Sequence, residues 1–202
     1  MDFADLRDRL GYQPLLLGAF ALLASATLTW VANLTREPIA AAEARDLRAS
    51  LSAVLPPGLA DNDLANDTLA LDRGGQPLTV HLARRDGTVQ AALFQTAGRG
   101  YAGEIRLLMA VDRDGRILGV RVLKHSETPG LGDKIEIAKD PWITSFEGRS
   151  LGDPPRERWG VRKDRGVFDQ FSGATITPRA VVWAVRDGLD FFAAHRADIL
   201  GD

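Results

Sequence analysis

The stretch that says most about the fold begins with the run Leu78-Thr79-Val80-His81-Leu82-Ala83. A turn at Asp86-Gly87 and a second run, Val89 to Thr96, follow it. Apolar and polar residues alternate along both runs, which is the period of a half-buried β-strand. An Asp-Gly pair between two alternating runs is a strong hairpin signal, because glycine readily adopts the positive φ of a tight turn. We therefore predict an antiparallel hairpin here.

A second unit with the same pattern follows directly. Ile105 to Val111 alternates, turns at Asp114-Gly115 and continues as Ile117 to Leu123. The alternation leaves each strand half polar, so we expect the sheet to pack one of its faces against helices. The polar stretch Asp61 to Gln76, which contains two glycines, is interpreted as a loop.

Helical patterns flank these hairpins. A helix is predicted from Pro178 to about His195, with Thr177 as its N-cap, because Thr before Pro is typical of a helix start. An apolar stripe on this helix is interpreted as core: Val181, Val185, Leu189 and Phe192. Lys134 to Lys139 and Trp142 to Phe146 are predicted as short helical or irregular pieces. The predicted fold class is α+β, a hairpin-built antiparallel or mixed sheet with flanking helices.

The N-terminal part carries a long apolar segment. Leu15 to Leu34 is predominantly apolar, and about 20 helical residues span about 30 Å, the thickness of a bilayer's hydrocarbon core. Ala24-Ser25-Ala26 resembles a signal-peptidase site, and a buried soluble helix is a further alternative, but the length favours a retained single-span anchor. A second helix is predicted from Glu37 to Leu55, with Pro38 in its first turn.

Composition excludes several classes of function. The chain has 202 residues, a formal net charge of -2 and no basic block, so nucleic-acid binding has no electrostatic support. It has no cysteine, which excludes disulfides and cysteine-ligated iron–sulfur clusters on this chain. His81, His125 and His195 lie far apart without metal-ligand spacing, so no metal site is expected. No acid, base or nucleophile constellation for substrate turnover is present, so no catalytic residue is expected.

The stretch Asp169-Gln170-Phe171-Ser172-Gly173-Ala174-Thr175 indicates a modification or anion site. Thr175 lies just before the predicted C-terminal helix, where unpaired N–H groups and the helix dipole favour a phosphate. Ser172, Gly173 and Ala174 are small, so a large ligand or a modifying enzyme could reach the Thr175 hydroxyl. The alternative is an ordinary turn that caps the helix.

This stretch resembles the flavinylation motif of the FMN-binding domain in the G subunit of the Rnf electron-transport complex. The C subunit of the sodium-pumping NADH:quinone reductase carries the same motif, but is usually longer. The resemblance implies that Thr175 is esterified to the phosphate of FMN. Pro178 stands where the family often has Ser, and proline suits the first turn of a helix.

A second loop resembles the same family. In His125-Ser126-Glu127-Thr128-Pro129-Gly130-Leu131-Gly132, Pro-Gly favours a type II turn, and an ordinary surface connection is the alternative. The resemblance makes this loop part of the flavin site. The candidate cofactor-binding residues are, altogether, His125, Glu127, Thr128, Leu131, Gly132, Lys134, Gly103, Asp169, Ser172, Gly173, Ala174 and Thr177. Lys134 and Lys163 could offset phosphate charge, and Gly100 and Gly103 could let backbone approach a flat ring.

The resemblance also implies the arrangement in the membrane. Residues 1–14 would form a short cytoplasmic N-terminus, 15–34 the transmembrane helix, 35–60 a membrane-proximal helix and linker, and 61–202 a periplasmic FMN-binding domain. The protein would be a single-pass component of the inner (plasma) membrane. The charges around the span set no orientation themselves, because Arg7 and Arg9 precede it while Arg36, Arg45 and Arg48 follow it.

The implied function is electron transfer within a translocase complex that couples ferredoxin and NAD to ion transport. The chain would relay electrons through covalent FMN and would not be catalytic alone. Its partners would be the other membrane and iron–sulfur subunits of the complex, with a flavin transferase that uses FAD and a divalent metal for maturation. Three alternatives stay open: a component of another redox complex such as the quinone reductase, a stand-alone FMN-binding reductase domain, and a non-redox anchored scaffold or small-ligand binder.

Overall fold

The computed structural model describes residues 12–201, which form two units: one reaches to Asp46 and the other begins at Leu47. The predicted N-terminal segment up to residue 11, including Arg7 and Arg9, lies outside the described residues.

One helix, α2 (Tyr12–Ala53), replaces the two that were predicted, the span from Leu15 to Leu34 and the helix from Glu37 to Leu55 with Pro38 in its first turn. Proline in a helix interior removes one hydrogen bond but does not by itself end a helix. The sequence around it holds no glycine stop, and good helix formers such as Ala, Glu, Arg and Leu continue to Ala53. Within α2, the segment Gln13–Arg36 is long and apolar enough to span a membrane.

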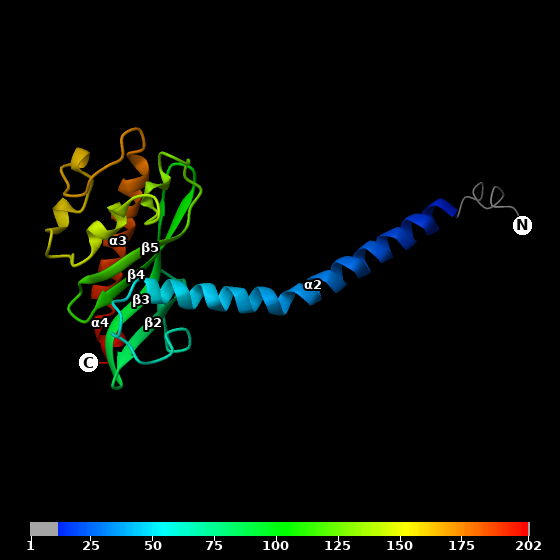
Figure 1. The fold of residues 1–202 in the computed structure, drawn as a ribbon, viewed down its shortest axis with the longest axis horizontal. Helices are drawn as coiled ribbons and strands as arrows, with labels where there is room; N and C mark the ends of the chain where they lie inside the picture. The colour runs from blue at the N-terminus through cyan, green and yellow to red at the C-terminus, as the bar shows by residue number, and fades with distance from the viewer. Residues whose placement is uncertain (1–11, 202) are drawn as a thin grey trace, which may run out of the picture. The chain divides into compact units, whose positions relative to one another are not determined.

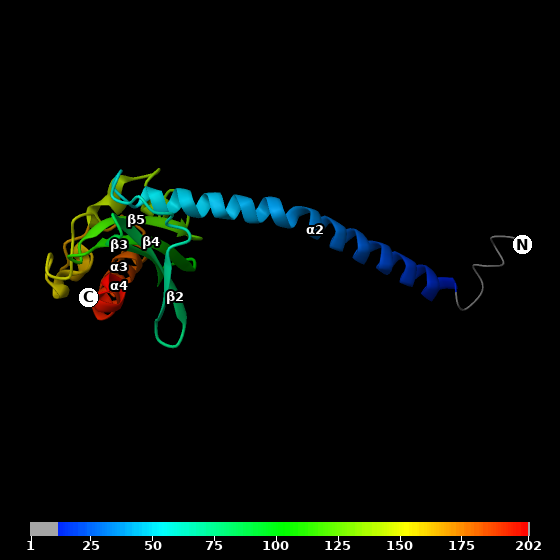
Figure 2. The same cartoon turned by 90° about the horizontal axis from the view of Figure 1, so that it is seen from below.

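The second unit is built on a five-stranded antiparallel sheet whose strands are arranged in chain order (Figures 1 and 2). The strands are β1 (Thr68–Asp72), β2 (Pro77–Arg85), β3 (Thr88–Arg99), β4 (Glu104–Asp112) and β5 (Ile117–Lys124). Both predicted hairpins are confirmed, with Asp86, Gly87 and Gly115 at positive φ in their turns. The sheet is antiparallel throughout, which settles the choice between antiparallel and mixed.

Strand β1 lies inside the stretch that was predicted as a loop, so that prediction was wrong. The strand has only five residues, with Leu69 and Leu71 as its apolar positions, and polar residues surround it. It is an edge strand that pairs only with β2. An element this short gives little periodic signal in the sequence. Its strand conformation is stabilised by pairing with β2.

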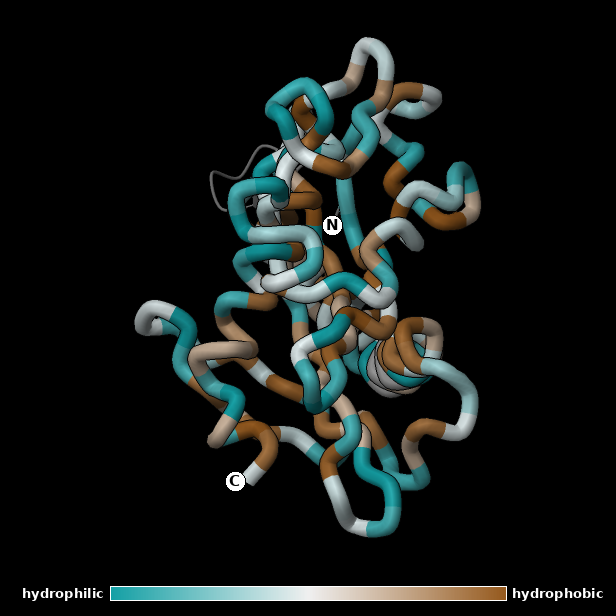
Figure 3. Tube along the Cα trace, turned by 90° about the vertical axis from the view of Figure 1, so that its left-hand side faces the viewer, coloured by the Kyte–Doolittle hydropathy of each residue, from teal (hydrophilic) through white to brown (hydrophobic). Residues whose placement is uncertain are grey.

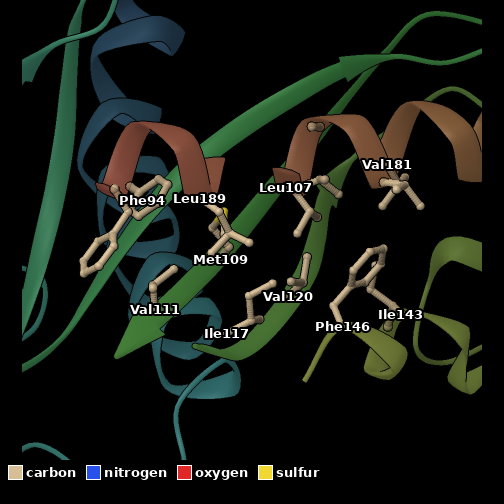
Figure 4. Close-up of a cluster of buried hydrophobic side chains, with 14 of the residues drawn as sticks. Phe94, Leu107, Met109, Val111, Ile117, Val120, Ile143, Phe146, Val181 and Leu189 are labelled. Atoms are coloured by element: carbon tan, nitrogen blue, oxygen red, sulfur yellow. The ribbon is translucent and has the colours of Figure 1, made fainter. Parts of the chain in front are cut away.

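Both faces of the sheet are covered, whereas the sequence predicted one. On one face, Phe94, Leu107 and Met109 form the main core with α3 (Ile176–Ala194), as Figure 4 shows for several of these side chains. On the other face, Leu51 and Val54 at the end of α2 pack on Ala83, Ala91, Leu93, Leu108 and Ala110. The prediction failed because the central residues of the two strands, Ala91 to Phe94 in β3 and Leu107 to Val111 in β4, are apolar on both faces.

Helix α3 confirms the predicted apolar stripe, since Val181, Val185, Leu189 and Phe192 are all buried. The helix begins two residues earlier than predicted, at Ile176, and Thr175 occupies the N-cap position. Thr177 therefore lies in the first turn of the helix and is not its N-cap. Its hydroxyl bonds the Glu127 side chain. A short helix, α4 (Arg196–Leu200), follows. Figure 3 shows hydrophobic residues along much of the inner part of the trace and hydrophilic residues at several outward-reaching turns.

Between β5 and α3 the chain forms short 3-10 helices and isolated β-bridges, and an aromatic cluster stabilises this region. The helices are η1 (Asp133–Ile135), η2 (Pro141–Phe146), η3 (Arg156–Arg158) and η4 (Arg162–Asp164). Phe146 is the centre of the cluster, with ring centroids 5.3 Å from Trp142, 4.6 Å from Phe168 and 6.3 Å from Trp159. Phe171 adds an edge-on contact with Trp142 at 5.2 Å.

Gly98 on β3 lets the start of α3 approach the sheet. A Cβ at this position would lie 2.5 Å from the carbonyl oxygen of Ala180 and 3.2 Å from the Ala184 Cβ. We expect Gly98→Ala to lower the free energy of unfolding by about 1–3 kcal/mol through overpacking, as measured by urea denaturation. Gly152→Ala is the matched control, because nothing lies within 4 Å of its Cβ position. Equal stability of the two variants would contradict this packing.

Candidate functional site

An open pocket of ≈ 370 Å³ lies where three separate segments of the second unit meet. They are the turn between β3 and β4, the loop after β5, and the residues that lead into α3. Ligand pockets typically enclose about 300–1,000 Å³, so this one has the size for a cofactor ring. Its lining consists of Tyr101, Glu127, Thr128, Leu131, Gly132, Gly173, Ala174, Thr175, Ile176 and Thr177.

Thr175 presents its hydroxyl at the N-terminus of α3. Its side chain makes no capping hydrogen bond to the helix, and the residue is half-buried. The first N–H groups of a helix have no intrahelical partner, and here they belong to Ile176 and Thr177, because Pro178 has none. The uncommitted hydroxyl, these N–H groups and the helix dipole together favour a phosphate group at this end of the pocket.

The approach to Thr175 is fixed by the residues before it. Phe171 is buried in the aromatic cluster, and Gly173 has a φ of 80°, which favours glycine. The Ala174 N–H donates to the carbonyl of Phe171 at 3.1 Å, which closes a tight turn. The turn leaves Ser172 and Gly173 exposed, so the hydroxyl of Thr175 is approached past small side chains.

The loop after β5 forms the opposite wall. The N–H groups of Leu131 and Gly132 donate to the carbonyl of Thr128 at 3.2 and 3.0 Å, and Gly130 has a φ of 80°. This confirms the turn predicted from Pro129-Gly130. Asp133 supports it by accepting a hydrogen bond from the Gly130 N–H at 2.7 Å. The turn directs Thr128 and Leu131 to the pocket.

Glu127 connects the three segments. Its side chain accepts hydrogen bonds from the N–H groups of Tyr101 at 3.2 Å and Ala102 at 2.9 Å. The Thr177 hydroxyl in the first turn of α3 also donates to this carboxylate. Both Glu127 and Thr177 are buried. Thr177 therefore does not cap α3. It holds the start of this helix against the loop after β5.

The rim of the pocket is apolar and exposed. Tyr101 is 74% exposed, Leu131 46% and Ile176 45%, although all three line the same pocket. Large apolar side chains left open to solvent around a concave site are typical of a binding surface. An apolar rim with a phosphate-favouring helix end suits a ligand with a flat ring at one end and an anion at the other.

Several predicted site residues do not line this pocket. His125 lies behind the loop: its Nε2 is 2.7 Å from Glu136, and its Nδ1 accepts the Glu127 N–H at 3.0 Å. These bonds require the proton of the neutral ring on Nε2. Lys134 and Ser172 are exposed. Gly103 lies in a neighbouring groove with Arg99.

Asp169 also lies outside the lining. Its carboxylate is exposed and pairs with Arg162 at 2.7 Å, while its carbonyl accepts from Trp142 Nε1 at 2.9 Å. These contacts orient the turn that leads to Thr175. The missing side chain of Gly100 makes room for the Glu127 carboxylate.

Two lining residues, Tyr101 and Ile176, were not among the predicted site residues. Tyr101 stands between the glycines at 100 and 103, and an aromatic residue in a glycine-rich turn is the signal that could have indicated it. Ile176 directly follows Thr175, and its exposure on the first helical turn depends on where α3 begins.

An ion pair fixes the first turn of α3 to η4. Arg179 donates to both oxygens of Asp164, at 2.6 and 2.9 Å, and these hydrogen bonds hold the pKa of Asp164 below its ordinary value of 3.8. A carboxylate whose folded pKa is lowered stabilises the fold above the unfolded pKa, and this contribution is lost as pH falls through the folded pKa.

We therefore expect Arg179→Gln to raise the pKa of Asp164 toward 3.8 and to weaken the acid dependence of stability below that pH. Carboxyl carbon NMR during a pH titration measures this shift. Arg196→Gln is the control, because Arg196 donates to the carbonyl of Arg113 instead. An unchanged Asp164 titration in Arg179→Gln would contradict the ion pair.

Comparison with known proteins first gives the class. Residues 100–190 match the FMN-binding domain family, and residues 14–54 match the RnfG N-terminal region. The matched domain includes all three pocket segments. The fold and site therefore define an FMN-binding-domain protein with an N-terminal membrane anchor.

Relatives then give the particular family. The chain is 56% identical to the G subunit of the ion-translocating oxidoreductase complex of Cereibacter sphaeroides, over 92% of this chain and 85% of that protein. It is 46% identical to the G subunit of the same complex in Pseudomonas aeruginosa, over 99% of this chain and 96% of that protein. The chain belongs to the family of G subunits of the ion-translocating oxidoreductase complex, which confirms the resemblance of its motifs. The chain is also similar to the crystal structure of Shewanella oneidensis NqrC. The match spans 72% of this chain and 74% of the NqrC chain, with 25% sequence identity and a TM-score of 0.49.

Proposed function

We propose that this chain is the electron-transfer subunit of a membrane ion-translocating ferredoxin:NAD oxidoreductase of the Rnf type. It carries FMN as a phosphoester on Thr175. One observation carries the proposal: the uncommitted Thr175 hydroxyl, at the N-terminus of α3, opens into the pocket that the FMN-binding-domain match encloses. When bound, FMN supplies a ring that accepts and passes on electrons.

The residues present fit both ends of this cofactor. The helix terminus at Thr175 to Thr177 suits the phosphate, and the exposed Tyr101, Leu131 and Ile176 suit the flat ring. Gly132 and Gly173 also line the pocket, and they project no side chain into it. The side chains of this rim would exclude water from one side of the ring.

Attachment through the phosphate leaves the ring chemically free. The Thr175 oxygen would form a bond to the flavin-side phosphorus of FAD, while the bond between the two phosphates breaks and AMP leaves. The hydroxyl loses its proton in this step. A separate flavin transferase with a divalent metal would supply FAD and remove the proton, because the pocket offers no base next to Thr175 other than the already bonded Glu127.

A covalent tether suits a relay. It prevents loss of the cofactor and replaces a bimolecular encounter by a fixed geometry. We further propose that α2 anchors the chain in the inner membrane with the domain on the periplasmic side, and that the other membrane and iron–sulfur subunits are its partners. The chain then acts as one station of the complex and not as an enzyme alone.

The test is purification of the full-length chain from its native membranes. We expect several membrane subunits to co-purify, and we expect yellow colour to stay with this chain after denaturation and gel filtration. Reduction of the complex by ferredoxin should bleach that colour, and reoxidation by NAD should restore it. A colourless chain, or a flavin that does not respond to either substrate, would refute the electron-transfer role and leave an anchored scaffold.

A further inference from the structure

Glu127 is a buried carboxylate in the wall of the candidate flavin pocket, only 5% exposed. Its two oxygens accept hydrogen bonds from three donors. Oε1 accepts from the Ala102 N–H, and Oε2 accepts from the Tyr101 N–H and the Thr177 hydroxyl. The donors come from two segments that are more than 70 residues apart in sequence (101–102 and 177). A single side chain therefore sets where the Tyr101 turn and the start of α3 lie around the pocket.

The chain is shaped to admit this carboxylate. A Cβ on Gly100 would lie 2.5 Å from Glu127 Oε1, and a Cβ on Gly132 would lie 2.8 Å from the Glu127 Cβ. A residue with a side chain at either position would displace Glu127. Neither glycine has a positive φ, so close approach to Glu127, and not backbone conformation, is what requires glycine there.

The hydrogen bonds favour a charged Glu127. Two backbone N–H groups can only donate, and donors to a carboxylate stabilise its ionised form. The three partners are neutral donors, so they stabilise the negative charge without cancelling it. A fixed charge in a partly buried wall acts more strongly on its surroundings than a charge in water.

We propose that Glu127 is the positioning residue of this pocket and that its fixed negative charge lowers the midpoint potential of a flavin held there. The proposal rests on the proposed function, because it needs FMN on Thr175. Reduction adds negative charge to the ring system, and a nearby anion makes that addition less favourable. Removal of the charge should therefore raise the potential, and loss of a donor that partly offsets the charge should lower it.

The experiment is a spectroelectrochemical redox titration of the full-length flavinylated chain, produced with a flavin transferase and purified in detergent. We expect Glu127→Gln to shift the midpoint potential to a more positive value. We expect Thr177→Val to shift it in the opposite direction, because the carboxylate keeps its charge but loses one donor. Asp112→Asn is the matched control and should leave the potential unchanged, since the Asp112 carboxylate also accepts two backbone N–H groups but lies at the end of β4 that is remote from the pocket.

The outcomes separate this inference from the proposed function. A wild-type chain without flavin refutes the proposed function. If the wild-type chain carries flavin and neither variant moves the potential, the inference fails and the proposed function stands. Should Glu127→Gln not fold, Thr177→Val decides alone, because a merely structural role predicts no shift toward negative values. A shift in Asp112→Asn as large as that in Glu127→Gln would also overturn the inference.

Discussion

The Thr175→Ala variant is expected to carry no covalently bound flavin, whereas the wild-type chain is expected to carry one FMN per molecule. The reason is that the ester needs an oxygen on this side chain, and the pocket places no other uncommitted hydroxyl at the N-terminus of α3. Thr177 also carries a hydroxyl in the first turn of α3, but it is buried and bonded to Glu127. Intact mass of the purified full-length protein measures the loss.

Two controls make the result specific. Thr175→Ser keeps the hydroxyl and should keep the flavin, and Ser172→Ala removes an exposed hydroxyl of the same motif and should change nothing. Because Thr175 makes no capping hydrogen bond, we expect its replacement by alanine to change stability by no more than about 0.5 kcal/mol. Flavin that remains covalently bound in a folded Thr175→Ala protein would contradict the assignment.

Replacement of Phe146 by alanine is expected to lower the free energy of unfolding by about 3–5 kcal/mol, the cost of removing a large aromatic ring from a packed core. Phe146 is fully buried and lies between Trp142, Trp159 and Phe168. Figure 4 shows it near Val120 of the sheet and Val181 of α3. The cavity would therefore open between the sheet, the helix and the 3-10 region.

Urea denaturation followed by tryptophan fluorescence measures this effect. Trp183→Ala is the control, since Trp183 is also aromatic but 46% exposed, and its removal should cost much less. The flavin site should respond as well, because Trp142 contacts Phe171 and donates to the Asp169 carbonyl, which fixes the turn before Thr175. A loss of less than about 1 kcal/mol in Phe146→Ala would show that this cluster does not hold the domain together.

The sheet was largely predictable from sequence because its signals are local. The Asp86-Gly87 and Asp114-Gly115 turns each specify a hairpin, and alternation gives the strands. Strand β1 and the coverage of the second face were not predictable in this way. Strand β1 pairs with the neighbouring β2, but its five residues are too few to show a clear period. The second face is covered by Leu51 and Val54, which are far from β3 and β4 in sequence.

The candidate site also has features that are local in sequence and features that depend on distant residues. Thr175 and the turn at Pro129-Gly130 follow from short-range chemistry, namely a helix start and the φ preference of glycine. The role of Thr177 does not, because its hydroxyl bonds a carboxylate 50 residues earlier in the chain. His125 and Lys134 belong to the predicted loop region but lie outside the pocket, since sequence proximity does not determine which side of a turn a side chain faces.

The central claim is the ester on Thr175, and the most direct measurement is fragmentation mass spectrometry of the tryptic peptide that spans residues 166–179. The protein should come from its native host, where the transferase is present. This peptide contains Ser172, Thr175 and Thr177, so fragmentation distinguishes the three hydroxyls. We predict a mass increase of one FMN minus one water, located on Thr175. An unmodified peptide, or FMN on Ser172 or Thr177, would contradict the account.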